Sequence, residues 1–132
     1  MDLKEYFEKT KGVSVLSTAD RAGLVNAAIY ARPHVGDDGK IAFIMADRLS
    51  HKNLQENPSA CYLFNEEGSV HQGKRLYLKK VGETDDQEKI KQLRRSCHGV
   101  CQKEAEEKRY LVYFDVVKEL PLVGSEDSPK GC

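Results

Sequence analysis

The sequence has no long hydrophobic run. None of its apolar stretches approaches the roughly 20 residues that a helix needs to span a bilayer. Its first residues, Met-Asp-Leu-Lys-Glu-Tyr, also lack the basic and then apolar order of a secretory signal. We therefore expect no membrane partner and a cytoplasmic location.

An excess of charge of one sign is absent as well. Lys and Arg together number 21, and Asp and Glu together also number 21, so the formal net charge is zero. Such a chain has no overall field that would attract nucleic acid or an anionic membrane, and we expect no nucleic-acid partner. An anion bound by this protein must be held by a local arrangement of side chains and backbone groups.

Cysteine is scarce and unevenly spaced, which argues against an extracellular disulfide framework and favours reduced thiols. The four cysteines are Cys61, Cys97, Cys101 and Cys132.

The segment from Cys97 to Cys101 also contains His98, and thiolate and imidazole are both zinc ligands. At helical spacing, however, the two cysteines share an apolar stripe with Leu93 and Val100. Burial as small hydrophobic residues is then the favoured interpretation, and we expect no metal site.

What remains is the composition of a single globular domain, with 39% hydrophobic and 32% charged residues in 132. Runs of alternating or β-branched residues, separated by Gly, Pro and Asp, predict six strands. They span residues 12–18, 24–31, 40–46, 60–64, 75–82 and 110–117. Helical periodicity predicts helices over residues 2–10, 51–56 and 85–108.

This order predicts a mainly β (α+β) fold: a six-stranded antiparallel β-barrel, with a short helix after strand 3 and a long helix before strand 6. The domain would span residues 1–120, and residues 121–132 would form a C-terminal tail. Short turns between strands argue against a parallel nucleotide-binding sheet, and the chain has no G-x-G-x-x-G fingerprint. The strand at 40–46 is apolar on both faces, as expected of a central strand.

The most informative segment is 41–64, in which an apolar strand, a short helix and a second apolar strand follow one another. Ser50 is predicted to be the N-cap of the helix, and Asn57-Pro58 to end it. A helix N-terminus with a Ser at the cap and Lys52 in the first turn can hold a phosphate group. Alternatively, Ser50 only caps the helix and Lys52 is solvated.

The order of strand, S-x-K, short helix, N-P and strand, after an N-terminal helix and a hairpin, resembles the FMN-binding split β-barrel family related to pyridoxamine 5'-phosphate oxidase. The similarity covers roughly residues 5–83 and implies an FMN cofactor. It also implies a homodimer with the flavin at the subunit interface, which the apolar strands 24–31 and 41–46 independently favour.

The resemblance implies specific contacts to FMN. His51 and Lys52 would bind the phosphate, with hydrogen bonds added by Ser50 and Asn53. The flavin ring would lie along two strands at Ala28, Ile29, Tyr30, Met45 and Ala46, and Arg75 would join the site from the fifth strand.

The oxidase itself has an additional C-terminal segment that this sequence does not match, so we do not expect pyridoxamine 5'-phosphate oxidase activity. The expected function is an FMN-binding oxidoreductase that transfers hydride or electrons through the flavin. The alternatives are a non-catalytic carrier of FMN or haem, and an interaction module with no cofactor. The candidate axial ligands for haem are His34, His51, His71 and His98, of which His34 and His71 are expected in polar loops.

Overall fold

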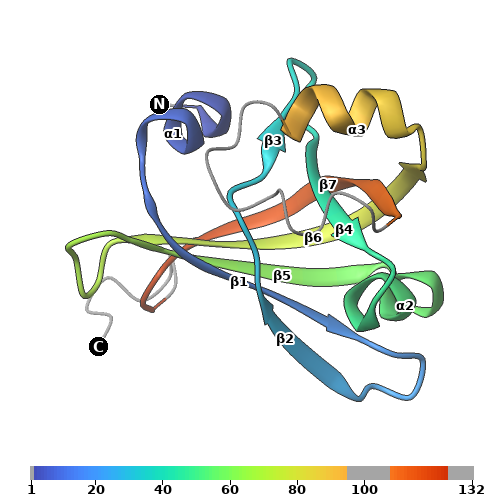
Figure 1. Ribbon diagram of the computed structural model, residues 1–132. Coiled ribbons are helices and arrows are strands. Elements are labelled where there is room, and N and C mark those ends of the chain that lie inside the picture. The colour runs from blue at the N-terminus through green and yellow to red at the C-terminus, as the bar shows by residue number, and fades with distance from the viewer. Residues whose placement is uncertain (1, 95–107, 125–132) are drawn as a thin grey trace.

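The computed structural model describes residues 2–94 and 108–124 (Figure 1). The helices are α1 (Leu3–Lys9), α2 (Leu49–Glu56) and α3 (Gln87–Arg94). The strands are β1 (Gly12–Ala19), β2 (Val25–Ile29), β3 (His34–Val35), β4 (Ile41–Ala46), β5 (Ser59–Glu66), β6 (Gly73–Thr84) and β7 (Arg109–Pro121).

The described strands form one antiparallel sheet in the order β2-β1-β5-β6-β7-β4-β3. The predicted mainly β, antiparallel class is confirmed. The predicted number of six strands is wrong, and the sheet is not closed, because β2 and β3 are its two edges. The additional strand is β3, in which His34 pairs with Ala42 and Val35 with Ile41. Two residues are too few to produce an alternating pattern, so the sequence gives no signal for this strand.

His34 therefore lies in an edge strand rather than in the polar loop that we predicted. It is half-buried, and this burial lowers the pKa of its imidazole.

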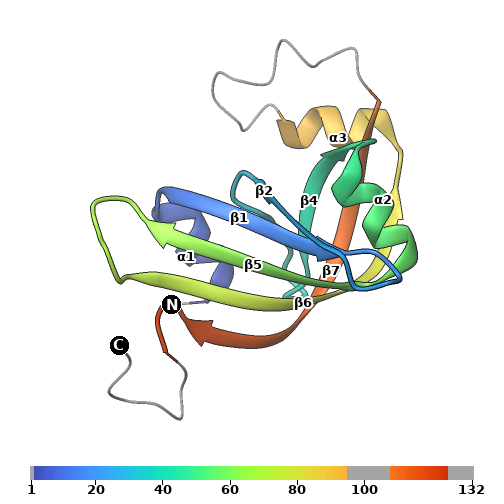
Figure 2. The same ribbon diagram turned by 90° about the horizontal axis from the view of Figure 1, so that it is seen from below.

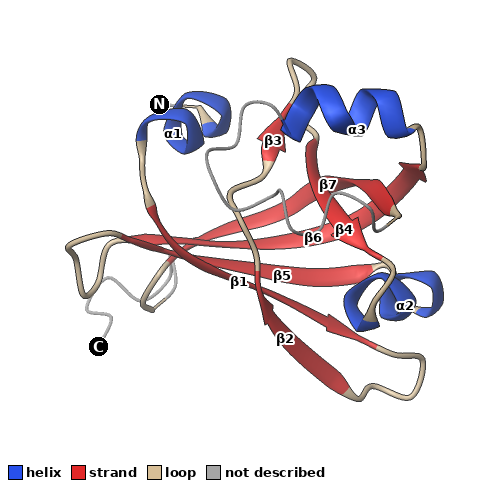
Figure 3. Ribbon diagram, in the orientation of Figure 1, coloured by secondary structure: helices blue, strands red, loops and turns tan. Residues whose placement is uncertain are grey.

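The helices of the described residues are distributed around the curved sheet. Figures 1 and 2 show α1 and α2 near opposite ends of the long strands, and α3 beside β4 and β7. Figure 3 shows the same arrangement by type of element, with α2 directly after β4. The described part of α3 ends at Arg94. The rest of the predicted helix 85–108, including Cys97, His98 and Cys101, lies outside the described residues.

The main core lies on the inner face of the sheet and is largely aromatic. Phe43, Tyr62, Phe64 and Phe114 are each at most 2% exposed, and α1 adds Phe7. The rings of Phe7 and Phe64 meet edge to face, with centroids 5.3 Å apart. Such contacts add to the hydrophobic stabilisation that burial of the rings provides.

Strand β4 is apolar on both faces because the chain itself covers both of them. Phe43 and Met45 enter the main core, whereas Ala42 packs with Ile90 of α3 and Leu111 of β7. Our use of residues 41–46 as evidence for a partner subunit is therefore wrong. Among the described residues, no helix is long and apolar enough to cross a membrane.

Replacing Ile90 by Ala tests whether α3 is an integral cover of the sheet. Ile90 is 1% exposed, and its removal should leave a cavity and lower the free energy of unfolding by about 2–4 kcal/mol. Urea unfolding followed by circular dichroism measures the change. Lys91→Ala, at an exposed position of the same helix, should change stability by less than about 0.5 kcal/mol. Equal effects of the two substitutions would contradict this packing.

Candidate functional site

The candidate site lies at the turn from β4 into α2. The helix begins at Leu49, so its N-cap is Arg48. The prediction of Ser50 as the N-cap is wrong. A guanidinium carries only hydrogen-bond donors, so the Arg48 side chain cannot accept a hydrogen bond from the first turn of the helix. The N–H groups of that turn, which no helical carbonyl satisfies, can therefore serve an external anion.

Ser50 lies in this first turn and is only 5% exposed, and its side chain interacts with Tyr30, the residue that follows β2. The hydroxyl groups of Ser50 and Tyr30 are hydrogen-bonded. Burial raises the pKa of Tyr30, while this hydrogen bond and the nearby charges of Arg109 and Arg48 act to lower it. The hydroxyl pair of Ser50 and Tyr30 thus lies at the start of α2, within the electrostatic influence of two guanidinium groups.

Arg109 reaches this position through strand pairing. It is the first residue of β7 and pairs with Ala46, the last residue of β4. The side-chain amide of Gln87 donates a hydrogen bond to the carbonyl oxygen of Arg109 at 2.9 Å and so links the start of α3 to the start of β7. Arg109 is 8% exposed, so its charge is largely shielded from solvent.

Lys52 adds a further positive charge at the start of α2. Its backbone N–H closes the first helical hydrogen bond, to the carbonyl oxygen of Arg48, at 2.9 Å. Its side chain is exposed to solvent. Within the described residues it forms no ion pair, so its ammonium group can move toward a ligand at the first turn.

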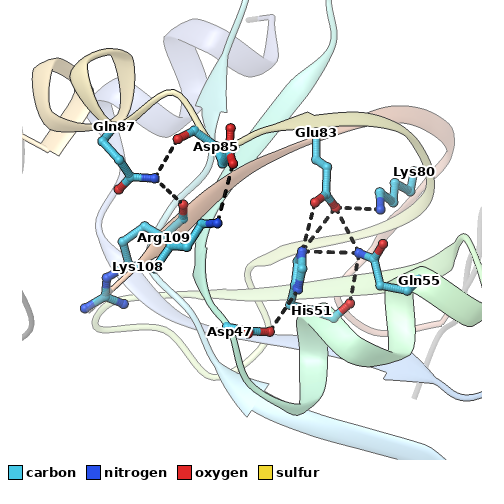
Figure 4. Close-up of polar contacts among 9 residues, drawn as sticks. All are labelled: Asp47, His51, Gln55, Lys80, Glu83, Asp85, Gln87, Lys108 and Arg109. Atoms are coloured by element: carbon cyan, nitrogen blue, oxygen red, sulfur yellow. Dashed lines mark hydrogen bonds and ion pairs between the residues drawn. The ribbon is translucent and has the colours of Figure 1, made fainter. Parts of the chain in front are cut away.

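Two of the predicted phosphate ligands have other partners. His51 is 6% exposed, and its Nε2 lies 3.0 Å from a carboxylate oxygen of Glu83 on β6 (Figure 4). Its ring stacks on Tyr110, with centroids 4.0 Å apart. Asn53 donates a hydrogen bond to Thr18 of β1 at 3.1 Å. Both side chains attach α2 to the sheet rather than facing the first turn.

Glu83 is held as a carboxylate by its neighbours. Burial alone would raise its pKa, but hydrogen bonds from Lys80, Gln55 and His51 outweigh burial and lower the pKa to about 2. Sequence reasoning missed this residue because we ended the fifth strand at residue 82, whereas β6 continues to Thr84.

The predicted contacts to the flavin ring do not share one face. Ala28 of β2 is half-buried on the inner side, and so is Tyr30, the residue after the strand, whereas Ile29 is 73% exposed on the outer side. Met45 is 1% exposed, so its side chain belongs to the core and could offer a ligand only main-chain atoms. Ala46, at the end of β4, is half-buried beside the start of α2.

Arg75 lies on β6, far along the strand from the residue that contacts α2. It precedes Glu83 by eight residues on β6, or roughly 25 Å at the rise of an extended strand. Its Nε donates a hydrogen bond to the carbonyl oxygen of Pro121 at 2.9 Å, and its second contact is the carbonyl oxygen of Gly124. Within one protomer, Arg75 is therefore not brought to the start of α2.

Solved structures share this architecture. An FMN-binding protein from Syntrophomonas wolfei matches with a TM-score of 0.71 and 22% identity over 92% of this chain and 84% of its own. The chain therefore has the split-barrel fold. An F420 reductase matches with a TM-score of 0.69 at 11% identity, covering 87% of this chain and 94% of its own.

A candidate pyridoxamine 5'-phosphate oxidase from Lactobacillus delbrueckii has a TM-score of 0.66 at 11% identity, with coverage of 91% and 92%. No family model and no curated protein sequence matches the chain. At these identities the similarity establishes the fold, and it leaves the ligand to be inferred from the site itself.

Acid titration should reveal the Glu83 network. As the pH falls, the unfolded state takes up the proton first, near pH 4.3, whereas the folded state holds Glu83 ionised down to about pH 2. The stabilisation from this carboxylate is thus fully present above about pH 4.3 and is lost toward pH 2. Between pH 5 and 3, wild-type protein should lose more unfolding free energy than Glu83→Gln does.

Urea unfolding at several pH values gives this comparison, and Glu67→Gln, at an exposed turn position, is the control. The control should retain the wild-type slope against pH. An unchanged slope in Glu83→Gln would show that the carboxylate is not held in the way described.

Proposed function

We propose that this protein is an FMN-binding flavoprotein that holds the flavin phosphate at the start of α2. The observation that carries the proposal is the hydrogen-bonded pair of Tyr30 and Ser50 at a helix N-terminus whose cap residue, Arg48, cannot cap it. The charges of Arg48 and Arg109 act on the same pair. The fold neighbour from Syntrophomonas wolfei, described as an FMN-binding protein, supports the same ligand.

The residues present fit a phosphate monoester. Such a group is mostly dianionic near neutral pH and has three acceptor oxygens. Backbone N–H groups of the first turn and the hydroxyls of Ser50 and Tyr30 can donate to those oxygens, while Arg48, Arg109 and Lys52 can balance the charge. The net charge of the protein is zero, so this local concentration of cations is what would select an anion.

The outer face of the sheet supports a dimer. Ile29, Val15 and Leu63 lie side by side across β2, β1 and β5, and all three face outward. Ile29 is 73% exposed and Leu63 is 37% exposed, and Val25 on the same face is 74% exposed. An apolar face of this kind favours a partner. We propose that a second copy covers it and that the flavin lies between the protomers, where Arg75 of the second copy could join the site.

When bound, FMN would supply hydride or electron transfer through its ring. The residues of this chain would bind the phosphate, orient the ring along β2 and the end of β4, and limit the access of water. A recorded visible spectrum separates the possible states of the purified protein, because FMN and haem absorb at different wavelengths and empty protein absorbs at neither.

Replacing Lys52 by Ala tests the phosphate assignment. The dissociation constant for FMN should rise by roughly 10- to 150-fold, which corresponds to about 1.5–3 kcal/mol for one charge-assisted contact. Riboflavin shares the ring but lacks the phosphate, so its affinity should change little. Titration of apoprotein, followed by quenching of flavin fluorescence at fixed salt, measures both constants.

Lys91→Ala removes an exposed cation from α3 and serves as the control for a general loss of positive charge. It should leave both constants within about two-fold of wild type. The phosphate assignment fails if wild-type protein binds FMN and riboflavin equally, or if Lys52→Ala weakens both alike.

Replacing Ile29 by Lys tests the dimer. A charge placed on the outer face should oppose burial against a second copy, so the variant should sediment as a monomer at micromolar concentration while wild-type protein is a dimer. FMN occupancy should also fall in this variant, because flavin binding and dimer assembly are then linked. Val70→Lys, in the exposed turn between β5 and β6, should remain dimeric. A monomeric wild type would contradict the proposal.

A further inference from the structure

His51 holds a buried position between two carboxylates. Its Nε2 lies 3.0 and 3.1 Å from the two carboxylate oxygens of Glu83, and its Nδ1 lies 3.4 Å from Asp47. The ring is stacked on Tyr110 at an interplanar angle of 12°. With both nitrogens facing carboxylates and one face on an aromatic ring, the imidazole has little capacity left for a phosphate.

These contacts connect the first turn of α2 to three other parts of the fold. Glu83 belongs to β6 and Asp47 to the turn after β4 (Figure 4). Tyr110 belongs to β7. His51 directly follows Ser50 in the sequence, so fixing the His51 side chain fixes the rotation of the helix about its axis at Ser50. That rotation decides whether the Ser50 hydroxyl faces Tyr30.

We propose that His51 is a positioning residue for the phosphate site, which acts through its hydrogen bond to Glu83 and does not touch the phosphate. The inference rests on the proposed function and reassigns one residue of that site. Preorganised donors bind more tightly because less ordering remains to be done when the ligand arrives, and His51 would supply that order for the start of α2.

The surroundings make this role testable by substitution. Without His51, Glu83 keeps the ammonium of Lys80 at 2.7 Å and the amide of Gln55 at 2.9 Å, so no unpaired carboxylate is left behind. The Gln55 amide also donates to the carbonyl oxygen of His51 at 3.3 Å, which preserves part of the helix attachment. The variant should therefore fold and lose chiefly the orientation of the first turn.

The experiment compares dissociation constants for FMN and riboflavin in His51→Ala, His51→Gln, Glu83→Ala and the double variant His51→Ala/Glu83→Ala. In His51→Ala, FMN binding should weaken by about ten-fold and riboflavin binding by less than about two-fold. His51→Gln retains a donor toward Glu83 and should recover most of the loss. The double variant should be no weaker than the weaker single variant, because both remove the same link.

Ile90→Ala is the matched control for lost stability, since it disturbs α3 and leaves α2 untouched; it should leave the ratio of the two constants at the wild-type value. Equal weakening of both flavins in His51→Ala would overturn the proposal in favour of a general structural role. Losses that add in the double variant, or that His51→Gln does not recover, would overturn it in favour of direct contact with the phosphate.

The preference of wild-type protein for FMN over riboflavin tests the proposed function separately. If wild type prefers FMN to riboflavin and His51→Ala retains that preference, the positioning role alone is wrong. If wild type shows no preference, the phosphate site itself is wrong, and the positioning role falls with it. Should His51→Ala not fold, Glu83→Gln gives the same test, because it keeps the shape of the side chain and removes the charged acceptor.

Discussion

The pairing of β4 with β7 is the constraint on which the rest of the site depends. These strands are separated by more than 60 residues, yet Ala46 pairs with Arg109 and Met45 with Tyr110. This register puts the end of β4, and therefore the start of α2, beside the first residues of β7. A shift by one residue would exchange the two faces of β7, turning Tyr110 away from His51 and Val112 out of the core.

Two neighbouring side chains at the start of α2 have different contacts. Ser50 is hydrogen-bonded to Tyr30, whereas His51 contacts Glu83 and Tyr110. One residue faces the place where an anion would bind, and the next attaches the helix to the sheet. Asn53, hydrogen-bonded to Thr18, provides a second attachment two residues further along the helix. A helix attached at two points presents its N-terminal N–H groups in a fixed direction, which favours a ligand of fixed shape.

Local patterns in the sequence predicted those elements whose period is expressed over several residues, such as the β1–β2 hairpin and the antiparallel, mainly β class. They could not reveal β3, whose two residues show no period. The N-cap was misassigned because Ser is a common cap, while here a tertiary contact to Tyr30 holds Ser50 inside the helix. Arg109 and Glu83 were missed because their positions depend on long-range register and on the last two residues of β6, neither of which leaves a local signal.

The central claim, that the first turn of α2 faces the phosphate of FMN, is tested most directly by nuclear magnetic resonance. Backbone amide signals of isotopically labelled apoprotein would be followed during titration with FMN and, separately, with riboflavin. The account predicts that the amides of Leu49, Ser50 and His51 shift strongly with FMN and little with riboflavin, because only FMN brings an anion to those N–H groups. Equal shifts with both ligands, or unchanged signals at these residues when FMN is bound, would contradict it.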